Sequence, residues 1–225
     1  QPDGSHALPG GVWDEATRTL LAVDLDAIRE DATHAWLGGD TPLHPREGHT
    51  EPRIDKPGGY TWNKAPRLAG RVVETGAIAR QLASGHALIR EAVAAQGSNV
   101  RNRVLARLLE VARVLPMMEA WLAALAPREA FFHPDHLPAE GEGVGLTEAA
   151  RGALGHWLRV QRGRIANYQI VAPTSWNFSP RDAAGTPGAL EAALVGAPVL
   201  QGEDTPVAVQ HVVRSFDPCM VCTVH

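Results

Sequence analysis

Apolar residues recur at intervals of three and four along the middle of the chain, and this periodicity restricts the fold more than any other feature. It predicts two helical segments, at residues 74–95 and 99–126, so the helical centre covers about residues 74–126. Within the second segment we expect one apolar stripe to face the core: Val104, Leu105, Leu108, Leu109, Ala112 and Leu115. The charged residues among them are expected largely in solvent: Arg101, Arg103, Arg107, Glu110 and Arg113.

A proline should shape the end of the second helical segment. Pro116 lacks an amide hydrogen and its ring clashes with the preceding turn, so the helix is expected to end or bend there. Residues 117–125 would then continue at an angle. Met117, Met118 and Trp121 are expected to fill the core.

The chain before the helices has a different character. Proline and glycine recur too often in residues 1–59 for long helices, and residues 16–34 fit helix and strand about equally. A stretch of this length without strong secondary structure is rare in a compact domain unless it wraps a neighbouring surface or carries a function. We therefore divide the chain into an irregular wrapping segment, 1–59, and a C-terminal portion, 60–225.

The chain after the helices mixes strand and helix signals. Two runs rich in β-formers, at about residues 153–171, predict a hairpin, and residues 188–195 predict a short helix. Alternating apolar residues over 207–215 favour a strand or extended segment. The predicted fold class is α+β and predominantly helical, with a helical bundle core and a small β-hairpin region.

Composition excludes several classes of protein. The formal charge is −4 and basic residues do not cluster, which argues against nucleic acid as a partner. The longest apolar runs fall short of the roughly 18 residues that cross a bilayer, and the first residues do not resemble a signal peptide. We expect a soluble, cytoplasmic chain whose membrane association, if it has one, is made through partners. Because residue 1 is not methionine, we also expect a processed or cut polypeptide.

The last nine residues, 217–225, hold both cysteines of the chain, at positions 219 and 222, and end on His225. A thioredoxin-like pair would open a helix, and none can follow here. A structural zinc site lacks a second pair of ligands, and a disulfide would close a small strained loop. A soft-metal site through Cys219 and Cys222, completed by ligands from outside this chain, explains the motif best.

The terminus resembles the Asp-Pro-Cys-x-x-Cys-x-x-His signature that closes the large subunit of nickel-iron hydrogenases. Three further segments resemble the same family in type, order and spacing. The Lys-Ala-Pro-Arg stretch and the Glu-x-Gly stretch that follows it form the first, and the Ala-Arg-Gly-Ala-Leu-Gly-His-Trp stretch forms the second. The Pro-Thr-Ser-Trp-Asn stretch forms the third. These segments are residues 60–80, 150–157 and 172–182.

The resemblance implies roles for residues around a nickel-iron centre whose iron carries carbon monoxide and cyanide. Cys219 and Cys222 would ligate nickel, and Cys222 would also bridge to iron. Arg67 would lie over the metals, paired with Asp217, and meet a cyanide ligand. Thr174 would donate to a cyanide, and two prolines would form an apolar wall. These prolines are Pro66 and Pro173.

The resemblance also implies a second, harder cation. His225 matches a terminal histidine that helps to bind magnesium, and Ile170 matches a position whose backbone carbonyl reaches the same ion. Carbonyl oxygen is a suitable hard ligand whatever the side chain. Family precursors commonly carry a C-terminal extension that is removed after nickel insertion, so His225 would be the mature terminus.

One departure from the family pattern limits what the chain can do alone. The family's second Cys-x-x-Cys pair, which supplies the other two nickel ligands, is missing, and so are its acidic residues. The N-terminal portion of the large subunit must supply them. The chain also lacks cysteines for iron-sulfur clusters, so electrons would pass to a partner small subunit that carries them.

The predicted function is therefore hydrogenase catalysis, H2 ⇌ 2H+ + 2e−, by heterolytic cleavage at a nickel-iron centre. A hydrogen-sensing role uses the same site and is one alternative. A non-catalytic assembly or interaction module that retains the fold is another, and a zinc-binding structural protein is a third.

Overall fold

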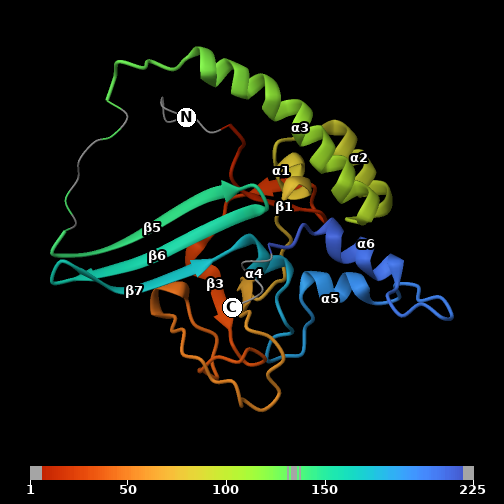
Figure 1. Ribbon diagram of the computed structural model, residues 1–225, viewed down its shortest axis with the longest axis horizontal. Coiled ribbons are helices and arrows are strands. Elements are labelled where there is room, and N and C mark those ends of the chain that lie inside the picture. Colours follow the sequence, from red (N-terminus) through yellow and green to blue (C-terminus); the bar gives the residue numbers. More distant parts are fainter. Residues whose placement is uncertain (1–6, 131, 133–135, 137, 220–225) are drawn as a thin grey trace.

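The computed structural model describes residues 7–130, 132, 136 and 138–219, and it has the α+β architecture that the sequence predicts (Figure 1). Its helices are α1 (Ala77–Ala83), α2 (Ala87–Gln96), α3 (Val100–Ala123), α4 (Pro173–Asn177), α5 (Ala189–Leu194) and α6 (Val207–Ser215). Its strands are β1 (Val12–Asp14), β2 (Thr19–Leu21), β3 (Ile28–Asp31), β4 (Ala65–Leu68), β5 (Glu140–Ala149), β6 (Gly152–Gln161) and β7 (Arg164–Val171). Single turns of 3-10 helix occur at Leu25–Ala27 and Pro45–Glu47.

The strands form small antiparallel sheets in the order β1-β2, β3-β4 and β5-β6-β7. The predicted hairpin is present as β6 and β7, joined through Arg162 and Gly163. The sequence did not predict β5, because three glycines at alternating positions remove side chains from one face of that strand: Gly141, Gly143 and Gly145. β5 nevertheless pairs with β6 along its whole length.

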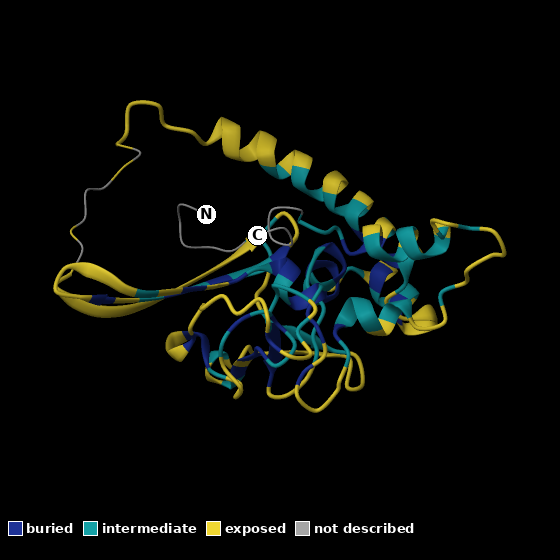
Figure 2. Ribbon diagram, turned by 60° about the horizontal axis from the view of Figure 1, so that its bottom comes forward, coloured by how far each residue is buried: buried dark blue, intermediate teal, exposed yellow. Residues whose placement is uncertain are grey.

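Among the described residues, the two larger of three apolar clusters join the helices and strands. One joins α1, α2 and α3 through Ile78, Leu82 and Ile89, all at most 8% exposed. The other joins β3 and β4 to the large sheet and α4, and includes Ile28, Leu68, Trp157, Val171 and Trp176. Figure 2 shows that buried residues gather where these elements meet, whereas the far ends of α3 and of the sheet are exposed.

The predicted segment 74–95 is two helices. α1 ends at Ala83 and α2 begins at Ala87, with Gly85 between them at a φ of 79°. Glycine adopts this left-handed conformation without steric cost, so it permits the sharp change of direction.

The prediction that the α3 stripe faces the core is wrong for most of the helix. Only Ala106 is a buried apolar residue of α3, with Leu105 and Leu109 partly buried against the same cluster. Apolar side chains farther along α3 are exposed, with fractions from 40% to 70%: Val104, Leu108, Val111, Leu115, Met118, Trp121 and Leu122. Met118 and Trp121 therefore do not fill the core of this chain. Arg103, expected in solvent, is 6% exposed.

α3 does not end at Pro116 but continues through it to Ala123, in keeping with the predicted continuation of the helix beyond the proline. Proline removes the bond to the carbonyl of Ala112, four residues earlier. Because Ala112 and Pro116 are both exposed, water can solvate that carbonyl.

The strand predicted at 207–215 is wrong as well, because this segment is helix α6. The alternation of valines fitted a strand, but Val209, Val212, Val213 and Phe216 also follow helical three-and-four spacing. Phe216 is buried and the three valines are partly buried. The tertiary contacts of this face with α3 and α5 decide between the two patterns.

Candidate functional site

The candidate site lies where the C-terminal segment meets the start of α4. The hydroxyl of Thr174 accepts a hydrogen bond from the backbone N–H of Cys219 at 3.2 Å. Thr174 is 2% exposed and follows Pro173, which occupies the first turn of α4, where a missing N–H costs nothing. Because a hydroxyl that accepts keeps its own hydrogen, Thr174 can still donate to a further group. Cys222 and His225 lie outside the described residues.

The chain turns into this site at the end of α6. The backbone N–H of Asp217 donates to Arg214 at 3.0 Å, and Asp217 adopts a φ of 55°. A left-handed residue just after a helix reverses the chain direction and satisfies a terminal carbonyl. Phe216 anchors the turn, since it is 4% exposed and lies 3.7 Å under the guanidinium of Arg103. Three residues after Phe216 the chain reaches Cys219.

The carboxylate of Asp217 lies between two arginines. Nε of Arg107, from α3, is 3.9 Å from Oδ2, and Nε of Arg151 is 3.9 Å from Oδ1. The predicted pair of Asp217 with Arg67 is therefore wrong. Sequence reasoning missed the pairing with Arg151, although Arg151 stands in one of the segments that resemble the hydrogenase family.

Arg151 occupies a tightly fixed turn. Residues 150 and 151 form the two-residue connection between β5 and β6. Arg80 of α1 donates to the carbonyl oxygens of Ala149 and Ala150, both at 3.0 Å, and also pairs with Glu148 and Glu110. The strand end that carries Arg151 is thereby tied to α1 and α3.

Gly152 completes this turn. Its φ is 136°, and a Cβ there would come within 2.4 Å of the Thr75 hydroxyl and 2.8 Å of the Gly76 amide nitrogen. Only glycine allows this close approach to the segment before α1. Arg151 is thus held by polar contacts on one side and by close backbone packing on the other.

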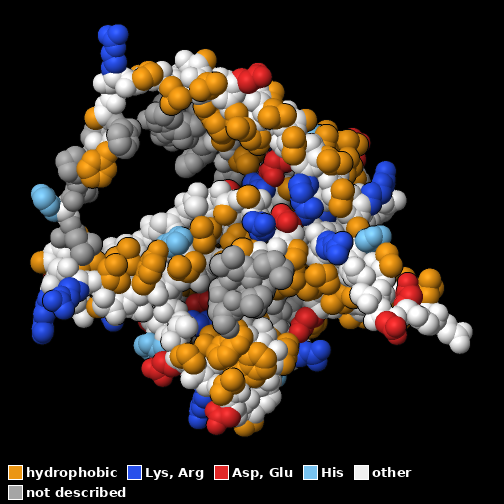
Figure 3. Space-filling model, in the orientation of Figure 1, with side chains coloured by type: hydrophobic (Ala, Val, Ile, Leu, Met, Phe, Trp, Pro, Cys, Tyr) orange, Lys and Arg blue, Asp and Glu red, His pale blue; other side chains and the backbone are white. Residues whose placement is uncertain are grey.

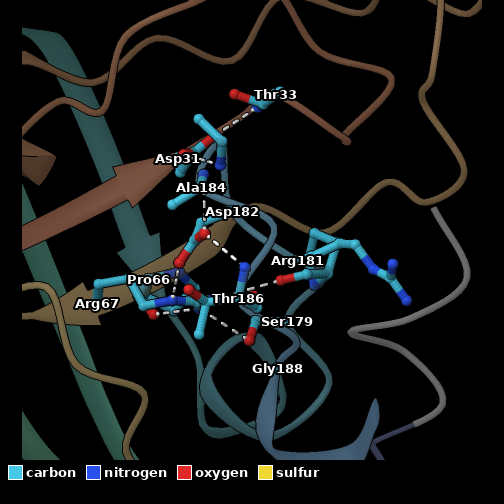
Figure 4. Close-up of polar contacts among 12 residues, drawn as sticks. Asp31, Thr33, Pro66, Arg67, Ser179, Arg181, Asp182, Ala184, Thr186 and Gly188 are labelled. Carbon is cyan, nitrogen blue, oxygen red and sulfur yellow. Dashed lines mark hydrogen bonds and ion pairs between the residues drawn. The ribbon is translucent and has the colours of Figure 1, made fainter. Parts of the chain in front are cut away.

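Arg67 lies in a separate, buried network (Figure 4). Its Nε donates to Oδ2 of Asp182 at 2.9 Å. The other four guanidinium hydrogens go to the carbonyls of Pro66, Pro180 and Thr186 and to the hydroxyl of Ser179, at 3.0 to 3.2 Å. A guanidinium has five N–H donors, so every donor of Arg67 is used within the fold. This arrangement is inconsistent with the predicted contact between Arg67 and a ligand of the metals.

Asp182 stabilises the loop before α5. Burial acts to raise its pKa, but hydrogen bonds from the Thr186 amide and from Arg67 outweigh that effect and lower the pKa below its ordinary value of 3.8. The neighbouring carboxylate of Asp31 accepts from the amides of Thr33 and Ala183. The two acids therefore fix one loop against β3 and β4.

A second buried polar cluster lies beside Pro66 and Ile170. Glu30 pairs with Pro66 across β3 and β4, and burial raises the pKa of its carboxyl although Lys64 is 3.6 Å away. Lys64 donates to Oε1 of Gln169 at 2.9 Å. Ile170 follows Gln169 on β7, with its side chain exposed.

A cavity of about 20 Å³ opens beside the Asp217 carboxylate, and this volume admits one water-sized molecule. Its lining includes Glu74, Arg103, Arg107, Arg151 and Asp217. Glu74 accepts from two guanidinium nitrogens of Arg103, at 2.7 and 3.1 Å. Arg107 and Arg151 each lie 3.9 Å from the Asp217 carboxylate.

Within the described ranges, no three His, Cys, Asp or Glu residues cluster closely enough to hold a metal ion. Cys219 is the one cysteine that the structure describes, and it is partly buried. Thiolate is a soft ligand that suits nickel. The backbone N–H of Cys219 contacts the buried Thr174 hydroxyl, and Asp217, two residues earlier, pairs with Arg107 and Arg151. The described residues therefore fit part of a nickel site and leave the other ligands to be supplied.

A family model described as nickel-dependent hydrogenase matches residues 1–225. The chain belongs to the nickel-dependent hydrogenase family. The uptake hydrogenase large subunit of Azotobacter chroococcum mcd 1 is 34% identical over 271 residues. The periplasmic [NiFeSe] hydrogenase large subunit of Desulfomicrobium baculatum is 35% identical over 221 residues.

The fold agrees with this membership. The Ni-Fe-Se hydrogenase from D. vulgaris Hildenborough superposes with a TM-score of 0.89 at 34% sequence identity, over 99% of this chain and 50% of that chain. The chain described here matches the C-terminal part of such large subunits. The match with the Azotobacter relative covers 97% of this chain and 44% of that protein. The match with the Desulfomicrobium relative covers 90% of this chain and 43% of that protein. It spans about half the length of the relatives that it matches.

Proposed function

We propose that this chain is the C-terminal portion of a hydrogenase catalytic subunit that carries out H2 ⇌ 2H+ + 2e−. The observations that support this most strongly are two contacts of the C-terminal segment, one between Cys219 and Thr174 and one between Asp217 and Arg151. The Cys219 amide is 3.2 Å from Thr174, and the Asp217 carboxylate, two residues away, is 3.9 Å from Arg151. These contacts join segments that are distant in sequence.

Cys219 and Cys222 are the proposed thiolate ligands of nickel, with Cys222 also bridging to iron. The centre, when bound, supplies the metal that polarises H2 and accepts its electrons, and its iron carries carbon monoxide and cyanide. Thr174 is the proposed hydrogen-bond donor to a cyanide, since its hydroxyl hydrogen is available. The buried rings of Pro66 and Pro173 form the apolar wall.

Arg151 takes the role that the sequence suggested for Arg67. Its guanidinium is partly exposed, at 45%, and faces the Asp217 carboxylate, whereas Arg67 has all five donors in use. A fixed cation can polarise a small molecule that lies beside it, and the neighbouring carboxylate can accept the proton that this molecule releases. The cavity next to Asp217 is large enough for such a molecule.

The second proposed cation is magnesium, held by His225 and by the backbone carbonyl of Ile170. Ile170 lies on β7, an edge strand of the three-stranded sheet. The partly buried Lys64–Gln169 side-chain contact at 2.9 Å restrains the residue next to Ile170, which supports a constant position for that carbonyl.

The proposed partners are H2, the N-terminal portion of the large subunit and a small subunit with iron-sulfur clusters. The apolar side of α3 supports the N-terminal portion of the large subunit as a partner. Hydrophobic side chains gather along α3 in Figure 3, and relatives have about as much chain again as this one. Exposed apolar surface of this extent is typical of a site that another segment covers.

No helix in the described part of the chain is long and apolar enough to cross a bilayer. The cytoplasm, with membrane attachment only through partners, stays the proposed location, although one relative is named periplasmic. Cell fractionation with antibody detection tests it.

Elemental analysis with infrared spectroscopy on the purified native complex tests the function. Nickel and iron in equal amounts, with carbon monoxide and cyanide stretching bands and H2-dependent dye reduction, are expected. Metal and bands without turnover would favour the alternative of a hydrogen sensor. Absence of nickel and of the bands would leave an assembly module, and zinc alone would indicate a structural zinc protein.

A further inference from the structure

We propose that Arg107 is a positioning residue, which fixes the Asp217 carboxylate so that one oxygen remains directed at Arg151. This inference rests on the proposed function and adds a residue to its site. Arg107 lies on α3 and has no place in the C-terminal motif.

The contacts of Arg107 define the geometry. Its Nη2 donates to the backbone carbonyl of Ser215 at 2.9 Å, and its Nε lies 3.9 Å from Oδ2 of Asp217. Arg151 approaches the other oxygen, Oδ1, also at 3.9 Å. One arginine therefore holds both the end of α6 and one oxygen of the carboxylate, and the second oxygen faces the guanidinium that we place at the reaction.

Arg103 provides the comparison that isolates this role. It lies one turn earlier on α3 and donates to the Ser215 hydroxyl at 3.3 Å, and it covers the ring of Phe216. Its Nε and Nη2 are bound to Glu74. Arg103 thus ties the same segment to α3 without touching Asp217.

The conformation of Asp217 explains why its carboxylate needs a residue that fixes its position. Its φ of 55° is uncommon for a residue with a side chain, and the side chain is 41% exposed. A partly exposed carboxylate has several rotamers, and an ion pair of this kind contributes little to stability. The effect of Arg107 should therefore appear in turnover and much less in thermal stability.

A double-mutant cycle in the native complex tests the inference. Arg107→Met and Asp217→Asn are measured alone and together, for H2 oxidation, nickel and iron content and the infrared bands. We expect Arg107→Met to keep its metals and its thermal midpoint, to shift the bands slightly and to lose about tenfold in turnover, close to the 1.4 kcal/mol that a factor of ten represents. In the Asp217→Asn background the same change should lower turnover less than twofold, because residues that act together are non-additive.

Two control variants make the result specific. Arg113→Met removes an α3 arginine that contacts Ser84 and not residues 215–217, and it should leave turnover unchanged. Arg107→Lys can restore the bond to the Ser215 carbonyl but not the two-point contact, so it should recover only part of the lost rate. Additive losses for Arg107→Met and Asp217→Asn, or full recovery by lysine, would show that Arg107 only caps α6 and would overturn the inference. A wild-type complex without nickel or turnover would instead overturn the proposed function.

Discussion

The Thr174 hydroxyl and the Cys219 amide, 3.2 Å apart, join the first turn of α4 to the C-terminal segment. Replacing Thr174 by valine keeps the shape but leaves the Cys219 N–H without this acceptor, at a cost of about 1–3 kcal/mol. We expect the valine variant of the complex to retain less nickel than wild type in elemental analysis. Thr174→Ser keeps the hydroxyl and should retain nickel. Equal nickel content in wild type, Thr174→Val and Thr174→Ser would contradict a role of the Thr174 hydroxyl at the nickel site.

Arg151 faces Asp217, so its geometry should matter for turnover. Arg151→Lys keeps the charge but loses the planar fork, and removal of one preorganised donor typically costs about 10²–10³-fold in rate. We expect the lysine variant to hold nickel and iron at wild-type levels while H2 oxidation falls by that factor. A variant with full turnover would remove Arg151 from the site.

Arg67 should affect stability rather than chemistry. Arg67→Met leaves Asp182 buried without its cation, and breaking a buried pair costs about 3–5 kcal/mol. We expect a clear drop in the urea midpoint, while the variant that remains folded keeps its turnover per nickel. Unchanged stability together with lost turnover would restore Arg67 to the catalytic role that its sequence motif suggested.

The same pair predicts a pH dependence. The folded pKa of Asp182 lies below 3.8, so near that pH the unfolded chain binds more protons than the folded one. The stabilisation from this group is complete above pH 3.8 and is lost as the pH falls through the folded pKa. The stability difference between wild type and Asp182→Asn should be largest at neutral pH and narrow below pH 3.8. Urea unfolding across that range measures it.

The exposed side of α3 gives a prediction for the complete subunit. Leu115 is 56% exposed in this chain, and the proposed covering by the N-terminal portion would bury it. Leu115→Glu would then bury a carboxylate, at a cost of several kcal/mol, whereas Leu115→Met would cost less than about 1.5 kcal/mol. We expect a lower thermal midpoint only for the glutamate variant. Equal midpoints would mean that this face remains in water.

Local patterns predicted much of the fold. The three-and-four spacing located the helices between residues 74 and 126, and the β-formers located β6 and β7. The direction in which α3 faces was not predictable, because the same stripe packs equally well on a core within the chain or on a segment outside it. The α6 segment satisfied both periodicities, and only its packing against α3 and α5 selects the helix.

The candidate site also has residues that the sequence predicted and residues that it did not. Motif spacing singled out Thr174, Asp217 and Cys219, and the structure brings these three together. The motifs led to the choice of Arg67, whereas the arginine beside Asp217 is Arg151. Arg67 forms an ion pair with Asp182, which is 115 residues away in the sequence. Arg151 lies in a turn whose carbonyl groups bind Arg80 of helix α1. Such partners are non-local, so no sequence window contains them.

The anchoring of the β5–β6 turn by Arg80 and Gly152 has a consequence for local unfolding. Contacts with α1 and α3 hold one end of this sheet, while most side chains of β5 are exposed. Backbone openings should therefore start at the end near Glu140 and Gln161 and stop before residue 151. Amide hydrogens would exchange along a gradient that slows toward the turn. The far end of the sheet can therefore open locally without moving the Arg151 guanidinium at the fixed end.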